Sequence, residues 1–241
     1  DINTSQMYSY NIEDKMSETL RFAFSWKYFS LGFLMQSDLK YQLNPLLGWQ
    51  SVGTQKKFLP KSFEFNFSNA SAPLKFYFWK NRISLSLSFV ASLNVNMQKI
   101  TESFFTFSPT IDFSIHEFLT LKIGTVSRND VIARYFQDSL NLGVTIPGEK
   151  NVLKDLLQSF YFWDKTMRQQ SGFKIKSIDI ALEHNLKDWT LNFTYSFRPE
   201  AKINPITNRT EFRPKSYIYG YLEPNQRYSR KNKNGKSRFS G

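Results

Sequence analysis

Residues 83–97 read ISLSLSFVASLNVNM, and this stretch decides the fold. All eight odd-numbered positions are apolar, and six of the seven even-numbered positions are serine or asparagine. A strand directs alternate side chains to opposite faces, whereas a helix would spread them around its circumference. The stretch is longer than the roughly 9–11 residues that a tilted strand needs to cross a bilayer, and strands of soluble domains usually have about five or six. It therefore predicts one long strand with an apolar face and an uncharged polar face.

The same alternation recurs in residues 20–28, 63–68, 105–115 and 189–197, with large aromatic side chains on one face and Ser, Thr or Asn on the other. In all, the pattern predicts roughly ten to twelve strands. We expect short connections at 116–118 and 185–188, and long ones at 36–61, 126–157 and 199–211, with a helical turn at 151–158. Short turns that alternate with long loops are typical of outer-membrane barrels.

The composition of the 241-residue chain narrows the class of protein. Aromatic residues make up 17% of it, which argues against disorder. The absence of cysteine excludes disulfide scaffolds, thiol catalysis and Cys-ligated zinc. There is no apolar run of 18 residues, so a transmembrane helix is not expected. The mean hydropathy of −0.44 is compatible with barrel strands, in which apolar and polar residues alternate.

The net charge of +12 raises the question of a nucleic-acid partner. Residues 224–241 contain six basic residues and no acidic one, so we expect a β-barrel segment over 1–222 and a polar tail over 223–241. A nucleic-acid interface would use this tail with Lys174 and Lys176, and would stack bases on Tyr217, Tyr219 and Tyr221. No RNA-binding or zinc signature accompanies them, and a polar barrel lining explains the same residues. We therefore expect no nucleic-acid partner.

Catalysis is not expected either. His116 and His184 are the only histidines, and each stands beside a glutamate that would point to the opposite strand face. A G-x-S-x-G elbow is missing, and the pair Asp179 and Glu183 is too weak a signal for a glycosidase. We expect no catalytic residues, no cofactor and no metal.

Aromatic residues near the expected strand ends predict an interfacial girdle, although an aromatic-rich soluble core has the same periodicity. The girdle candidates are Trp26, Tyr28, Trp79, Trp163, Trp189 and Tyr219. On the strands, we expect an apolar set to face lipid (Leu85, Leu87, Phe89, Leu93, Phe193, Tyr195) and a polar set to face the interior (Ser86, Ser88, Asn192, Thr194).

The edges of the sheet are expected at residues 20–28 and 212–221. The second segment contains Pro214, and proline within a sheet is largely confined to edges, bulges and first positions. Its weak pairing would make it a lateral seam, with Phe212, Pro214, Tyr217 and Tyr221 as the candidate residues.

Two segments carry a resemblance to a known family. Residues 171–199 (SGFKIKSIDIALEHNLKDWTLNFTYSFRP) join an alternating strand to a second one through a short turn, with Phe173, Lys174, His184, Asp188 and Trp189 as the matching residues. Residues 105–130 look like an upstream hairpin that closes with Ser127, Arg128 and Asn129. Both resemble the C-terminal barrel of the LPS-assembly protein family (LptD, organic solvent tolerance protein).

This resemblance implies an outer-membrane barrel of a diderm bacterium that receives lipopolysaccharide from periplasmic bridge proteins. It also implies a plug lipoprotein as partner and lipid release through a seam between the first and last strands. Members with this role are several times longer and have an N-terminal periplasmic domain, and many have paired cysteines. We therefore expect this chain to be a fragment or a divergent member.

Together these patterns predict an all-β protein, either an antiparallel transmembrane β-barrel or the C-terminal part of a larger one. The expected function is translocation or insertion of lipopolysaccharide or another glycolipid in the outer-membrane bilayer. A porin-like channel is the alternative within the same class, and it would carry a charged constricting loop, for which 126–157 is the candidate. A soluble β-barrel or β-sandwich binding module is the alternative from another class.

Overall fold

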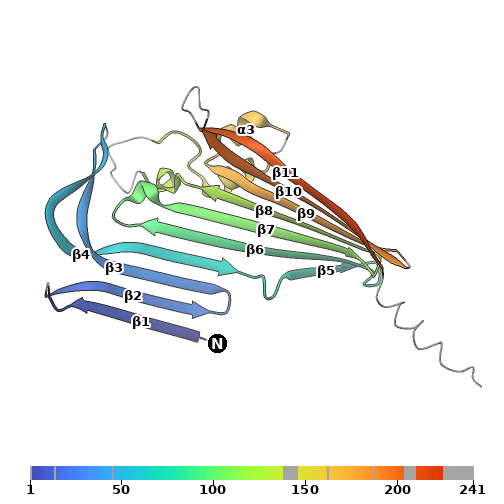
Figure 1. The fold of residues 1–241 in the computed structure, drawn as a ribbon, viewed down its shortest axis with the longest axis horizontal. Coiled ribbons are helices and arrows are strands. Elements are labelled where there is room, and N and C mark those ends of the chain that lie inside the picture. Colours follow the sequence, from blue (N-terminus) through green and yellow to red (C-terminus); the bar gives the residue numbers. More distant parts are fainter. Residues whose placement is uncertain are drawn as a thin grey trace, which may run out of the picture. The chain divides into compact units, whose positions relative to one another are not determined.

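The computed structural model describes residues 2–13, 15–44, 46–137, 146–161, 163–186, 188–203 and 210–224 (Figure 1). They form an 11-stranded, mostly antiparallel sheet in which the strand order follows the chain. The strands are β1 (Ile2–Asn11), β2 (Met16–Trp26), β3 (Phe29–Asn44), β4 (Gly48–Ser68), β5 (Leu74–Phe78), β6 (Ile83–Asn96), β7 (Phe104–Ile115), β8 (Leu119–Asn129), β9 (Phe173–Asn185), β10 (Trp189–Ile203) and β11 (Thr210–Pro224). The described helices are η1 (Ile100–Glu102), η2 (Ile132–Phe136), α2 (Val152–Ser159) and α3 (Lys165–Gln170).

The all-β prediction is confirmed, and so are the five strands expected from alternation. The hydrogen-bonded order starts at β1 and ends at β11, with β5 paired to β6 off this path. The described residues thus make an open sheet, and its closure into a barrel belongs to the proposals below.

The first of two compact units comprises Asp1–Ser71, Phe89–Ser108 and Ser127–Ile175. Its register aligns the aromatic positions of successive strands: Phe22 lies opposite Phe33, and Phe33 lies opposite Phe63. Phe67 continues the row, with its ring centroid 5.0 Å from that of Phe29 and 5.1 Å from that of Phe89. Cross-strand aromatic pairs of this kind stabilise the sheet and make one face continuously apolar.

The second unit comprises Ala72–Ser88, Pro109–Val126 and Lys176–Gly241. Here Phe193 lies opposite Leu182 on β9 and Gly220 on β11. Tyr195 lies opposite Ile180 and Ile218 in the same way. One face of this unit is therefore apolar too, as the alternation in 189–197 predicts.

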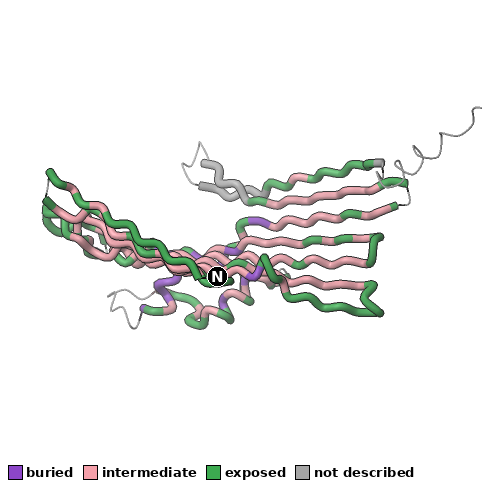
Figure 2. Tube along the Cα trace, turned by 90° about the horizontal axis from the view of Figure 1, so that it is seen from below, coloured by how far each residue is buried: buried purple, intermediate pink, exposed green. Residues whose placement is uncertain are grey.

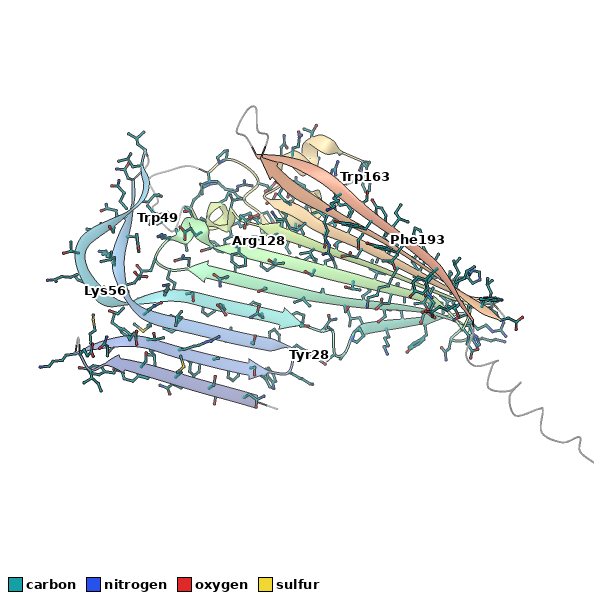
Figure 3. All side chains as sticks on the ribbon, in the orientation of Figure 1. Tyr28, Trp49, Lys56, Arg128, Trp163 and Phe193 are labelled. Carbon is teal, nitrogen blue, oxygen red and sulfur yellow. The ribbon has the colours of Figure 1, made fainter. Side chains whose placement is uncertain are left out.

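Two of the three expected long connections are wrong. In 36–61, β3 and β4 pair until Asn44 lies opposite Gly48, and in 199–211 the strands β10 and β11 continue to Ile203 and from Thr210. Polar residues such as Lys56 interrupt the alternation there (Figure 3). The β3–β4 register shifts between Asp38 and Lys40, and pairing resumes where Lys40 lies opposite Val52. Pro60 lies where the β3–β4 register shifts, a position that tolerates a missing N–H donor.

The third long connection is real and partly helical. It follows β8, which ends at Asn129, and its described part contains η2, α2 and α3. The expected helical turn at 151–158 is confirmed as α2, whose N-cap residue Asn151 accepts hydrogen bonds from the N–H groups of Leu153 and Lys154. The short connections at 116–118 and 185–188 are confirmed as well.

The expected edge at residues 20–28 is wrong. Residues 20–26 of this segment lie in β2, which pairs with β1 on one side and with β3 on the other. The first strand of the sheet is β1, whose apolar face is interrupted by Thr4 and Gln6, so that its alternation is weak. At the other end, β11 has β10 as its neighbour in the strand order, as expected of an end strand.

Very little of the described chain is buried (Figure 2). The buried apolar residues are Ile132, Ala133 and Phe173. A domain of this length normally buries an apolar core between two packed layers. Within the described residues of each unit, the apolar face of the strands stays mostly half-exposed or exposed.

Candidate functional site

The polar face of the first unit contains a ladder of hydrogen-bonded polar side chains. Asn66 on β4 donates from Nδ2 to Ser30 Oγ on β3 at 3.3 Å, and it accepts at Oδ1 from Ser92 Oγ on β6 at 2.5 Å. One step along the strands, Asn94 Nδ2 donates to Glu64 Oε1 at 3.3 Å. The neighbouring position on β3 is Gly32, and a Cβ there would lie 3.4 Å from the Glu64 side chain. These residues form a hydrogen-bonding surface with one carboxylate in it.

A shallow pocket of about 270 Å³ lies on this face. Its lining joins the ladder to β1 and β2 and includes Arg21, Ser25, Ser30, Glu64 and Asn66. One cation and one anion among hydroxyl and amide groups can hold a polar ligand such as a sugar.

The polar face of the second unit has a row of tyrosine side chains on β11. Tyr217, Tyr219 and Tyr221 lie opposite Ser196, Thr194 and Asn192. Ser196 Oγ also hydrogen-bonds to Asp179 Oδ1. Tyr219 was expected in the girdle, but the register places it on this polar face. With Ser196 and Arg198, Tyr217 and Tyr219 line a pocket of about 400 Å³.

Three turns of the second unit are joined by hydrogen bonds. His116 donates its backbone N–H to the carbonyl of Arg82 at 2.6 Å, and Asn185 donates its own to the carbonyl of Phe118 at 2.8 Å. Exposed aromatic side chains stand on these turns: Trp79 is 66% exposed and Trp189 50%. The Arg82 guanidinium lies 5.4 Å from the Trp79 ring. Amphipathic rings beside cations, at strand ends, have the chemistry of an interfacial girdle.

The remaining girdle candidates are placed less uniformly. Trp26 and Tyr28 lie at the β2–β3 turn of the first unit, as predicted (Figure 3). Trp163 is 82% exposed, but it lies between α2 and α3, where it stacks on Tyr161 with ring centroids 5.5 Å apart. It is therefore not at a strand end.

A buried polar cluster, which the sequence did not predict, holds the β8–β9 connection together. Asp155 is fully buried, and its carboxylate accepts hydrogen bonds from the Tyr135 hydroxyl and from the N–H of Gly172 (3.0 Å to Oδ2). Asn129 at the end of β8 donates from Nδ2 to the Tyr135 hydroxyl at 2.5 Å, and Ser171 Oγ donates to the Asp155 carbonyl at 2.8 Å. The cluster ties α2 to the ends of β8 and β9.

The electrostatics of this cluster follow from its burial. Burial raises the pKa of the Tyr135 hydroxyl well above its usual range, and its hydrogen bond to the Asp155 carboxylate raises it further. The Arg134 guanidinium lies near the same carboxylate, with Nη1 3.8 Å from Asp155 Oδ2. A Cβ at position 172 would lie 2.8 Å from Asn129 Nδ2 and 2.9 Å from Asp155 Oδ2, so glycine is needed there.

Two of the residues that carry the family resemblance, Phe173 and Lys174, lie beside the β8–β9 connection and have structural roles. Phe173 is 1% exposed and meets the Phe105 ring edge-on at 5.6 Å. Lys174 donates from Nζ to the backbone carbonyls of Arg168 (3.1 Å), Gln169 (3.0 Å) and Ser171 (2.6 Å) at the end of α3. His184 lies opposite Leu191 within the β9–β10 ladder, and Asp188 lies in the turn directly before Trp189, the first residue of β10.

Of the seam candidates, Phe212 and Pro214 are described through their backbone, which pairs with Ala201 and Pro199 on β10. The basic tail beyond Pro224 lies outside the described residues. Within the described part, no group of three or more His, Asp or Glu side chains could hold a metal ion. None of the described helices is long and apolar enough to span a membrane.

Comparison with known proteins gives no relative: no family model, no curated protein and no solved structure matches the chain.

Proposed function

We propose that this chain is the membrane-spanning sheet of an outer-membrane β-barrel that moves lipopolysaccharide or a related glycolipid toward the outer leaflet. The observation that carries the proposal is the exposed apolar face. Phe22, Trp26 and Phe29 are 44%, 50% and 37% exposed, while the buried apolar residues of the described chain number three. Some apolar medium has to cover this face.

A bilayer is the medium that fits best. A soluble β-sandwich would cover the face with a second sheet, because burying one Phe or Leu side chain contributes about 1.5–3 kcal/mol. Lipid covers a single-layer sheet without one, and the long alternating strands match the thickness of a membrane. In lipid, the ends at β1 and β11 would leave backbone groups unpaired at several kcal/mol each. We therefore propose that these strands close the barrel, either on each other or on further strands.

The polar face supports a glycolipid as the cargo. Ser30, Asn66 and Ser92 offer neutral donors and acceptors, which suit the hydroxyl groups of a sugar. The resemblance of 105–130 and 171–199 to the LPS-assembly protein family supports the same cargo, with a plug lipoprotein and periplasmic bridge proteins as partners. In this proposal β11, with Pro214, parts from the first strand of the completed barrel to release the lipid sideways.

The experiment places a photo-crosslinking amino acid at single positions of the protein expressed in a diderm bacterium. Position 66 reports the polar face, and position 65, opposite Leu31 and Leu93, is the matched control on the apolar face. We expect lipopolysaccharide crosslinks from position 66 and phospholipid crosslinks from position 65.

The absence of lipopolysaccharide crosslinks at position 66 would contradict the cargo. If the same protein, inserted in planar bilayers, also conducted ions steadily, the porin-like channel would replace the translocator. Recovery in the soluble fraction without any lipid crosslink would favour the soluble binding module.

A further inference from the structure

A pocket of about 940 Å³ lies in the β8–β9 connection, and it shares no lining residue with the pocket on the polar face. Arg134 of η2 lines it, together with Lys150 before α2, Gln158 of α2, and Gln169 and Gln170 of α3. The helices that carry these residues are fixed by the buried cluster around Asp155. Sites for small molecules have about 300–1,000 Å³, so the pocket is large enough for a monosaccharide derivative.

Arg134 is the unusual member of this lining. It is 8% exposed, and its Nε and Nη1 atoms have no hydrogen-bond acceptor among the described residues. Its closest carboxylate, Asp155, stays at 3.8 Å, because the Asp155 oxygens are engaged by Tyr135 and Gly172. Buried guanidinium donors without acceptors are costly, and an oxyanion is the ligand that would satisfy them.

The position of the guanidinium is fixed by its neighbours. Gly148 has φ +126° and lies so close that a Cβ there would be 2.5 Å from Arg134 Nη1. Only glycine allows this approach, so the backbone of the loop holds the charge in place on the wall of the pocket.

The rest of the lining is rich in amides and contains one lysine and one glutamate. Lys150 adds a second positive charge, while the carboxylate of Glu149 is engaged by Lys154 at 2.7 Å. The three glutamines each offer two N–H donors and one carbonyl acceptor, which is the pattern that neighbouring hydroxyl groups of a sugar require.

We propose that this pocket binds a phosphorylated sugar, with the phosphate at Arg134 and Lys150 and the sugar hydroxyls at the glutamines. The proposal goes beyond the function proposed above, since the pocket lies outside the strands and needs neither a bilayer nor a translocation step. The phosphorylated sugar can be a soluble molecule or the headgroup of a glycolipid, and the experiment distinguishes these sources.

The test is calorimetric titration of the folded full chain with glucosamine 1-phosphate, glucosamine and inorganic phosphate. We expect glucosamine 1-phosphate to bind best, because it alone engages both halves of the pocket. Arg134→Lys and Gln169→Leu should each weaken it, the former roughly 10- to 100-fold. Gln169 is exposed on α3, so Gln169→Leu tests the pocket even if Arg134→Lys unfolds the connection.

Lys122→Ala is the matched control, since it removes one positive charge from an exposed side chain of β8 in the other unit. Its affinity should equal that of the parent protein. A parallel arm uses phosphatidylcholine vesicles with and without a phosphorylated diglucosamine lipid. Binding that depends on Arg134 and Gln169 in the soluble arm assigns a free sugar phosphate, and such binding in the vesicle arm alone assigns a lipid headgroup.

Three results would overturn the proposal: no binding in either arm, equal affinity for inorganic phosphate and glucosamine 1-phosphate, or equal losses in Lys122→Ala and Arg134→Lys. The soluble arm involves no lipid, so its outcome is independent of the crosslinking result at position 66.

Discussion

Replacing Asp155 with alanine should unfold the β8–β9 connection while the strands stay paired. The change removes the acceptor of the Tyr135 hydroxyl and of the Gly172 N–H, and leaves the Arg134 charge buried without its nearest anion. Removing one member of a buried ion pair typically costs about 3–5 kcal/mol. Since about 1.4 kcal/mol is a factor of ten, amides of α2 should exchange with solvent roughly 100- to 3,000-fold faster.

Hydrogen exchange followed by mass spectrometry measures this directly, with peptides from 146–175 compared with peptides from β10. Asp164→Ala is the matched control: Asp164 is a half-buried N-cap residue that accepts from the Met167 N–H at 3.0 Å. Its loss should cost only about 1 kcal/mol. Unchanged exchange in α2 of Asp155→Ala, or equal effects of the two variants, would refute the role of the buried cluster.

Three further predictions concern other parts of the chain. The pKa of the Tyr135 hydroxyl is raised in the folded state, so its contribution to stability is complete below the unfolded pKa of about 10 and is lost as the pH rises further. The sensitivity of residues 146–175 to protease should therefore increase above that pH. A sensitivity that does not change with pH would contradict the burial of the hydroxyl. Trp189→Ala should slow membrane assembly, measured by the heat-modifiable mobility of the folded protein, whereas His184→Ala should have little effect; a zinc-dependent activity lost in His184→Ala would refute the non-enzymatic interpretation. Deletion of 225–241 should leave that mobility unchanged, and its loss would show that this segment is a folded element.

The strands could be predicted where one face is strictly apolar. The apolar face of residues 83–97 and of residues 189–197 is uninterrupted, and a one-residue slip would move every aromatic side chain to the polar face. The same rule failed where the apolar face is interrupted. In β1, Thr4 and Gln6 share a face with Ile2 and Tyr8, and only the pairing with β2 identifies the strand.

The β3–β4 hairpin was missed beyond Asp38 for a different reason. It carries lysines on both strands and depends on backbone pairing and on contacts between distant residues. Trp49 donates from Nε1 to Thr101 Oγ1 at 2.7 Å, and Lys61 bonds to Asp38 at 3.2 Å. Sequence periodicity contains no signal for such contacts.

Sequence analysis could not predict the buried cluster either, because its residues are separated along the chain: Asn129, Tyr135, Asp155 and Gly172. Asn151 before the apolar positions of α2 was the one local signal, and it did predict a helical turn. The exposed turn aromatics Trp26, Trp79 and Trp189 were foreseen from their places near strand ends. Tyr219 was assigned to the girdle from its position alone, without the register that places it on the polar face.

The measurement that tests the central claim most directly is a comparison of the two faces of the sheet in lipid. Single cysteines at positions 65, 93 and 193 of the apolar face, and at 66, 94 and 194 of the polar face, would carry a fluorescent label in protein folded into vesicles. The account predicts quenching by brominated lipid chains at the first set and by aqueous iodide at the second. Lipid quenching at 66, 94 and 194, or no lipid quenching at any of the six positions, would contradict it.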